Sequence, residues 1–152
     1  MPSVLFVCTA NICRSPIATA IWQSKVANEL SNWVIKSAGT WALVGEPAAQ
    51  NTQLVLANMG LDVGSHRARS VSRELLGQFN LILTMEKGQK EALHTEFPDF
   101  RDRVFLISEM INEYFDIHDP YRDPIIEYQA TAGEIESILS QGYERVIELS
   151  SP

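Results

Sequence analysis

The beginning of this chain restricts its fold more than any other segment, because an apolar run leads through a short loop into a helix. Ser3–Val7 is a largely apolar run, typical of a strand buried on both faces. Ser15-Pro16 is a favourable helix opening, with serine as N-cap and proline at the first helical position. We expect this helix to run from Pro16 to about Leu30. Its buried face would carry Ala18, Ile21, Trp22, Val26 and Leu30.

Strands and helices alternate along the rest of the chain. We predict strands at 33–36, 79–84 and 104–107, a short helix from Ser72, and helices at 51–59, 86–96, 108–113 and from Asp123-Pro124 to about Leu149. Gly60 would cap the C-terminal end of the helix at 51–59. Loops are predicted at 37–49 and 115–123. This alternation predicts a parallel sheet covered by helices on both faces. The ligand site of such a fold lies beyond the carboxyl ends of its strands.

Length and composition place the chain among ordinary globular proteins. Its 152 residues predict a single domain, 1–152, and no apolar run approaches the ~18 residues of a membrane span. No signal peptide is recognisable, so we expect a cytoplasmic monomer without membrane insertion. The net charge of −7 argues against binding to nucleic acid or anionic membranes. An anionic substrate must therefore be attracted locally.

The only two cysteines, Cys8 and Cys13, lie close together near the N-terminus. So few cysteines argue against a structural disulfide framework. A zinc site is poorly supported as well, because the three histidines are scattered far downstream. We therefore predict a reduced, reactive pair and no metal or other cofactor.

The loop after the first strand has the composition of an oxyanion site. Its residues are Cys8, Thr9, Ala10, Asn11, Ile12, Cys13, Arg14 and Ser15. A strand-loop-helix turn of this length can direct backbone N–H groups inward, and the following helix adds its positive end. Arg14 supplies a planar fork for two phosphate oxygens. The same field favours the thiolate form of Cys8, to which Ser15 could donate a hydrogen bond.

A purely structural interpretation of this loop is also open. A cysteine at the end of a buried strand is often only a small apolar filler, and a cysteine six residues before an arginine occurs by chance. The preceding strand and the following helix opening favour the catalytic interpretation. The glycine-rich motifs of other phosphate-binding loops are absent.

Beyond the loop, the sequence resembles the low-molecular-weight protein tyrosine phosphatases. The resemblance is carried, in order, by Val4–Pro16, Ser37-Ala38-Gly39, His66-x-Ala68-Arg69, Leu81–Glu86 and Asp119-Pro120-Tyr121. Ala42–Gly45, Leu83–Lys87 and Asp119–Arg122 further resemble the bacterial branch tied to tyrosine kinases of exopolysaccharide production. The family fold would be a single-domain three-layer α/β sandwich of flavodoxin-like, phosphotyrosine phosphatase I-like type. Its four-stranded parallel sheet would have the order 2-1-3-4.

The resemblance implies a role for each matching residue. Cys8 would be the nucleophile, Arg14 the phosphate clamp and Asp119 the general acid and base. Asn11, Ser15, Ser37 and His66 would form the network that shapes the loop, and Cys13 would form a reversible disulfide with Cys8. The substrate would be a phosphotyrosine protein, and a bacterial tyrosine autokinase is the partner that the branch suggests.

Ala10 departs from the family, which usually has glycine at this position. If the backbone there required a positive φ, alanine would cost ~1 kcal/mol or more and would strain the loop.

Asp123 is a rival for the role of general acid, because Asp123-Pro124 repeats Asp119-Pro120. Asp123 has a structural explanation as N-cap of the last helix, with Pro124 at the first helical position. Asp119 has no such local role, so we favour it as the acid.

Trp41, Leu43 and Tyr121 are candidates for the walls of the substrate cleft, although Trp41 and Leu43 could be ordinary exposed loop residues. Two other functions remain open. Arsenate reductase has a similar scaffold but relays oxidation through further cysteines, and none follows Cys13. A non-catalytic phosphate-binding module would be expected to lose the cysteine or the acid, and this chain keeps both.

Overall fold

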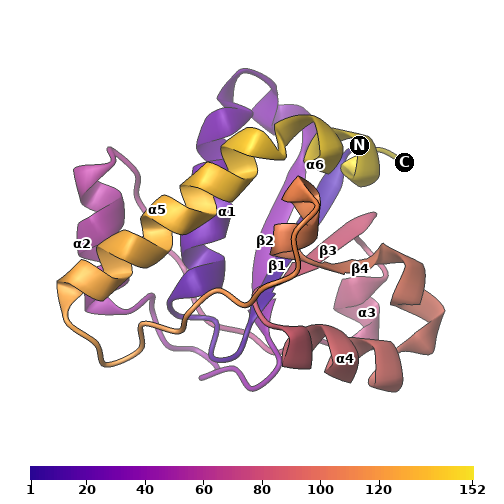
Figure 1. Ribbon diagram of the computed structural model, residues 1–152, viewed down its shortest axis with the longest axis horizontal. Coiled ribbons are helices and arrows are strands. Elements are labelled where there is room, and N and C mark those ends of the chain that lie inside the picture. The colour runs from indigo at the N-terminus through magenta and orange to yellow at the C-terminus, as the bar shows by residue number, and fades with distance from the viewer.

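The computed structural model describes residues 1–152 and has an α/β architecture (Figure 1). A four-stranded parallel sheet has the strand order β2-β1-β3-β4, as the family resemblance implied. The strands are β1 (Ser3–Cys8), β2 (Val34–Gly39), β3 (Leu81–Thr84) and β4 (Val104–Leu106). The α-helices are α1 (Arg14–Lys25), α2 (Gln50–Asn58), α3 (Arg73–Leu76), α4 (Lys87–Glu96), α5 (Ile125–Gln141) and α6 (Tyr143–Ser150). Three 3-10 segments are η1 (Ala27–Asn32), η2 (Pro98–Arg103) and η3 (Ile107–Ile111).

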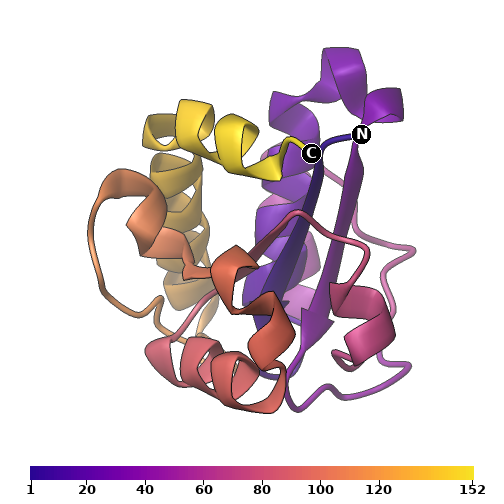
Figure 2. The ribbon, with the colours of Figure 1, turned by 90° about the vertical axis from the view of Figure 1, so that its right-hand side faces the viewer.

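The two faces of the sheet are covered by different helices, which gives three layers (Figures 1 and 2). Side chains of β1 alternate between the faces: Val4 and Phe6 belong to a cluster with α1 and α5, whereas Leu5 and Val7 pack with α3 and α4. Both faces of the sheet are therefore buried at β1, which explains why the β1 sequence is nearly uniformly apolar.

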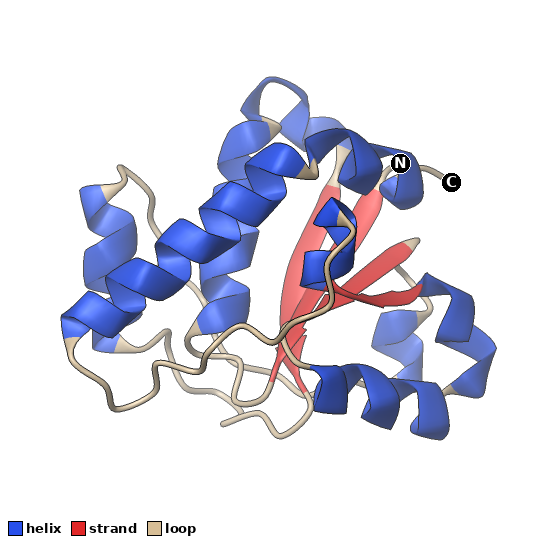
Figure 3. Ribbon diagram, viewed as in Figure 1, coloured by secondary structure: helices blue, strands red, loops and turns tan.

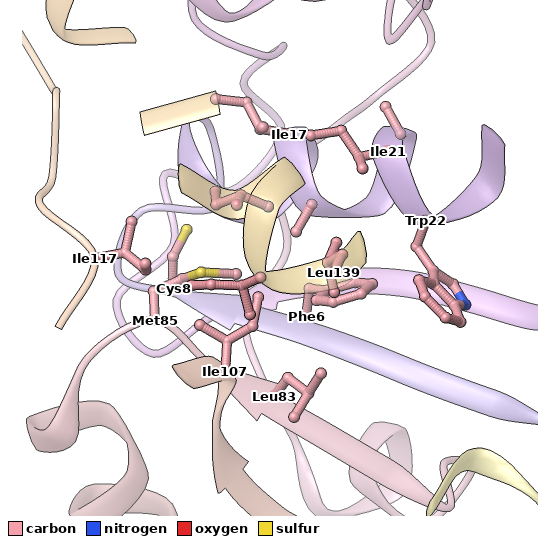
Figure 4. Packing of buried hydrophobic residues seen from close by; sticks show 14 of the residues in the cluster. Phe6, Cys8, Ile17, Ile21, Trp22, Leu83, Met85, Ile107, Ile117 and Leu139 are labelled. Atoms are coloured by element: carbon pink, nitrogen blue, oxygen red, sulfur yellow. The ribbon is translucent and has the colours of Figure 1, made fainter. Parts of the chain in front are cut away.

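The larger cluster leads to the end of β1 from which the cysteine loop departs. Figure 4 shows Cys8 at one end of this cluster together with Ile117 and Met85, and Trp22 at the other end. The loops collect at the carboxyl ends of the strands (Figure 3). Packing thus fixes the base of the loop that the sequence singled out.

The first helix differs from its predicted bounds at both ends. It begins at Arg14 with Cys13 as N-cap, so Ser15 is not the cap and Pro16 lies inside the first turn. Proline is tolerated there, because the first four helical N–H groups have no intrahelical partner. The helix ends at Lys25, and η1 has no buried residue; Leu30 is exposed rather than on the buried face.

Two further boundaries also differ from the predictions. β2 extends to Gly39, because its residues pair in register with β1 as far as Cys8; Ser37 is thus in a strand and not in a loop. The last helical segment divides at Gly142 into α5 and α6. A Cβ at Gly142 would lie 2.8 Å from the Met110 backbone oxygen, so η3 crosses too closely for a side chain.

Asp123 is not the N-cap of α5. The helix begins at Ile125, and Pro124 is the cap residue without a side-chain hydrogen bond. The Asp123 carboxylate instead lies 2.8 Å from His118 Nε2. No helix of the structure is long and apolar enough to cross a membrane.

Candidate active site

The loop Cys8–Ser15, here called the phosphate loop, joins the last residue of β1 to the second residue of α1. It passes close to the end of β2, where a Cβ on Gly39 would collide with the Thr9 backbone oxygen. Glycine at this position therefore allows the close approach of the two strand ends. Backbone bonds from Trp41 to Thr9 (2.9 Å) and from Leu43 to Ala10 (3.1 Å) hold the segment after β2 against the loop.

Cys8 lies at the base of the loop and is only 2% exposed. Its Sγ is 2.9 Å from Ser15 Oγ, so the serine hydroxyl is positioned to donate to a thiolate. Ser15 is itself fully buried. This geometry is the one that the sequence predicted for the pair.

Asn11 is the centre of the hydrogen-bond network around the loop. Its side-chain amide donates to Ser15 Oγ at 2.8 Å and to Ser37 Oγ at 2.9 Å. Its side-chain oxygen accepts from the Arg69 backbone N–H at 2.9 Å, and its backbone oxygen lies 2.6 Å from His66 Nε2. The structure thus brings together the four predicted network residues and adds Arg69.

The unusual backbone conformation of the loop is at Asn11 and not at Ala10. Asn11 has a φ of 63°, whereas Ala10 is not among the residues with positive φ. Asparagine tolerates the left-handed region better than most residues do. Alanine at position 10 consequently carries no strain of the kind that a required positive φ would impose.

Arg14 is 1% exposed and is held from two sides. Its Nη1 donates to the Ile117 backbone oxygen at 2.8 Å, and its Nη2 lies 3.3 Å from Glu86 Oε2 and 3.5 Å from Asp119 Oδ2. Its buried Nε has no hydrogen-bond partner. A buried guanidinium with an unused donor can bind an oxyanion.

Glu86 and Gln89 are site residues that the sequence reasoning did not single out. Gln89 Nε2 donates to Glu86 Oε2 at 2.9 Å and to Thr9 Oγ1 at 3.0 Å, which links the start of α4 to the phosphate loop. The signal was present in the matching segment Leu81–Glu86, where an acidic residue stands two positions after the last residue of a strand.

Asp119 lies on the segment 117–123, here called the acid loop, and its side chain is 43% exposed. Its second oxygen accepts from the Tyr121 backbone N–H at 3.1 Å. Of the two candidate acids, Asp119 is the one in contact with Arg14, whereas Asp123 pairs with His118.

His118, Asp123 and Glu127 could hold a metal ion, since their ligand atoms lie within 4.8 Å of one another.

Two groups near the loop, the buried Cys13 and the half-buried His66, have shifted pKa values. Burial raises the pKa of Cys13 to about 11, and its Sγ lies 3.5 Å from the Tyr128 hydroxyl. Burial also lowers the pKa of His66, which Arg69 and Arg67 lower further against the effect of the bond to Asn11. His66 is therefore a neutral ring that donates from Nε2 to the Asn11 carbonyl. Neither cysteine is in a disulfide.

The predicted wall residues are all exposed: Trp41 by 81%, Leu43 by 41% and Tyr121 by 41%. Trp41 and Leu43 belong to the segment bonded to the phosphate loop, and Tyr121 follows Asp119 on the acid loop. Apolar side chains thus stand on the segment bonded to the phosphate loop and on the acid loop.

Comparisons with known proteins agree with this geometry. Residues 3–149 match the family described as low molecular weight phosphotyrosine protein phosphatase. The low molecular weight protein-tyrosine-phosphatase Wzb of Escherichia coli (strain K12) is 42% identical over 79% of this chain and 78% of its own. A protein-arginine-phosphatase of Geobacillus stearothermophilus is 32% identical over 94% of this chain and 95% of its own.

Solved structures give the same result. The low molecular weight protein tyrosine phosphatase from T. tengcongensis superposes with a TM-score of 0.90 at 36% identity, over 95% of this chain and 99% of the other. Sequence, fold and loop geometry therefore lead to one conclusion: this chain belongs to the low molecular weight phosphotyrosine protein phosphatase family.

Proposed function

We propose that the protein hydrolyses phosphotyrosine through a phosphocysteine intermediate on Cys8. The observation that carries this proposal is Arg14, a buried cation of the phosphate loop whose Nε has no hydrogen-bond partner. A tetrahedral phosphoryl group in the loop would give that donor an acceptor and would lie over Cys8. The chain's membership of a phosphatase family supports the same reaction.

In the first step, the Cys8 thiolate attacks phosphorus, and the bond from phosphorus to the tyrosyl oxygen breaks. Asp119 donates a proton to the departing oxygen, which leaves as tyrosine. Arg14 and the backbone N–H groups of the loop stabilise the charge on the remaining phosphoryl oxygens. Contact between Asp119 and Arg14 at 3.5 Å supports the placement of acid and clamp around one phosphoryl group.

In the second step, water attacks the phosphocysteine, and Asp119, now ionised, takes its proton. The bond between phosphorus and sulfur breaks, and inorganic phosphate leaves. The hydrogen bond from Ser15 supports the departing thiolate, consistent with the 2.9 Å separation of Sγ and Oγ. This sequence restores the enzyme without a metal or another cofactor.

The substrate is proposed to be a phosphotyrosine on a protein, and in the cell a tyrosine autokinase of exopolysaccharide production. Exposed Trp41 and Tyr121 offer apolar surface to an aromatic ring. A phosphoarginine is the competing substrate, because some relatives are protein-arginine-phosphatases. Its guanidinium would need hydrogen-bond acceptors such as carboxylates, which the ring of a phosphotyrosine does not.

The decisive measurement compares phosphate release from a phosphotyrosine peptide and a phosphoarginine peptide of the same sequence, in chelator. We expect turnover of the first and its loss in Cys8→Ser, which replaces the nucleophile but leaves the Ser15 hydroxyl. Full activity of Cys8→Ser would overturn the mechanism, and preference for phosphoarginine would overturn the substrate. Capture of phosphorylated partners by the Cys8→Ser protein would then identify the autokinase or exclude it.

Arsenate reduction is the weaker alternative. It requires a relay of electrons through cysteines beyond the nucleophile, and the chain has none after Cys13. A non-catalytic phosphate-binding module is also the weaker alternative, because this chain retains both a nucleophile and an acid.

A further inference from the structure

A pocket of about 500 Å³ lies behind the phosphate loop, between α1, β2 and the segment 62–69. Thr19 of α1 and Lys36 of β2 line it, together with Arg67 and Arg69. Only three of its thirteen lining residues are hydrophobic, and its one ring, the imidazole of His66, is held 2.6 Å from the Asn11 backbone oxygen. Such a wall fits a small polar ligand and has no Phe, Tyr or Trp on which a nucleobase could stack.

The pocket is basic although the protein carries a net charge of −7. None of Lys36, Arg67 and Arg69 forms an ion pair with a carboxylate. Asp62, the one acidic residue of the wall, accepts from the Gly64 backbone N–H at 2.8 Å. Unpaired cations around a concave surface concentrate positive potential, which attracts a multivalent anion.

Three residues of the pocket wall contact Asn11, the centre of the catalytic network. Ser37 Oγ accepts from the Asn11 amide at 2.9 Å, His66 Nε2 lies 2.6 Å from its backbone oxygen, and the Arg69 N–H donates to its side chain at 2.9 Å. Asn11 in turn donates to Ser15, which contacts the nucleophile. A ligand that displaces Arg69 or His66 therefore acts on the loop through one residue.

We propose that this pocket binds a compact multivalent phosphate, such as pyrophosphate or a sugar bisphosphate, and thereby changes the affinity of the phosphate loop for its own phosphoryl group. The site is separate from the loop that holds the substrate, so the two anions bind together. By linkage, occupancy of the phosphate loop changes the affinity of the pocket by the same factor. The pocket would thus regulate the enzyme according to the level of phosphorylated metabolites.

Calorimetric titration of pyrophosphate into the native protein tests the site, with the phosphate loop saturated beforehand by benzylphosphonate. We expect one saturable event, weakened about tenfold or more in Lys36→Ala/Arg67→Ala. The exposed pair Arg101→Ala/Arg145→Ala removes the same charge elsewhere and should weaken binding much less. Equal weakening in both double variants, or no saturable event, would overturn the site.

A second measurement tests the coupling to Asn11. The affinity for benzylphosphonate should change with saturating pyrophosphate, and the amide resonance of Asn11 should shift during the titration. Arg67→Ala, an exposed single change, should reduce both effects while leaving turnover without pyrophosphate unaltered. Pyrophosphate binding with an unchanged benzylphosphonate affinity would overturn the coupling. The benzylphosphonate affinity and the Asn11 resonance are both measured without turnover. Failure of the proposed phosphatase reaction would therefore be seen separately, in the Cys8→Ser comparison.

Discussion

The two loops that meet at Arg14 are built in opposite ways. In the phosphate loop, Cys8, Asn11 and Ser15 are at most 2% exposed and hydrogen-bonded to one another. In the acid loop, the Asp119 side chain is 43% exposed and is held by one backbone N–H and the edge of Arg14. The difference separates two tasks: a buried frame fixes the anion, whereas a proton donor at the solvent edge can exchange its proton with water.

The largest expected effect comes from replacing the guanidinium of Arg14 in the phosphate loop. Arg14→Lys keeps the charge but loses the paired donors and the bond to the Ile117 carbonyl, so kcat/KM should fall by about 10³-fold. Steady-state kinetics with p-nitrophenyl phosphate checks this, with the exposed Arg73→Lys as control. A loss below about fivefold would mean that charge alone holds the phosphoryl group.

The role of the exposed acid loop is tested by removing its proton donor, Asp119. Asp119→Asn should lower kcat by about 10²-fold, and more for phenyl phosphate than for p-nitrophenyl phosphate, because phenolate is the poorer leaving group. Asp123→Asn is the matched control and should retain most activity, since that carboxylate pairs with His118. A larger loss in Asp123→Asn would transfer the role of acid to Asp123.

The position of Cys13 in the buried frame gives a redox prediction. Peroxide oxidises Cys8 to a sulfenic acid, and condensation with the Cys13 thiol forms a disulfide and releases water. Because burial raises the pKa of Cys13 to about 11, this condensation should be slow near neutral pH and faster at higher pH. Recovery of activity by dithiothreitol after peroxide should be nearly complete in the native protein and several-fold lower in Cys13→Ser. Equal recovery would remove Cys13 from this role.

The smallest expected effect is on the pH dependence of stability and concerns His66, a half-buried residue that contacts the phosphate loop. Its pKa is lowered in the folded state, so the unfolded chain binds more protons near and below its ordinary pKa of ~6.5. The contribution of His66 to stability is therefore complete above that pH and is lost as the pH falls. Thermal unfolding of His66→Gln, which keeps a donor for the Asn11 carbonyl, should depend less on pH between 7 and ~5. Parallel curves for the two proteins would contradict this.

Local sequence signals predicted the parts of this architecture that are set by neighbours along the chain. The alternation of strands and helices, the strand before Cys8 and the short helix at Ser72 are all present in the structure. The strand order required the family resemblance, because pairing between strands leaves no local mark. The break at Gly142 depends on the approach of Met110, which no helical periodicity records.

The site shows the same division. The clustering of Cys8, Arg14 and Ser15 follows from their closeness in sequence, and the resemblance brought in Asp119 from far downstream. The bond of Arg14 to Ile117 and its ion pair with Glu86 span 103 and 72 positions, so nothing in the sequence around Arg14 indicates these contacts. The residue type at Ala10 suggests strain, but the left-handed position belongs to its neighbour Asn11.

The bonds of Asn11 to Ser37, His66 and Arg69 also make the loop a late product of folding. A nascent or partly unfolded chain that has formed only β1 and α1 lacks these partners, and a left-handed Asn11 would have little to hold it. Such a chain has every residue of the signature but no assembled anion site. Phosphate should consequently bind the native state alone, and its addition should raise the unfolding temperature as its concentration rises above its Kd.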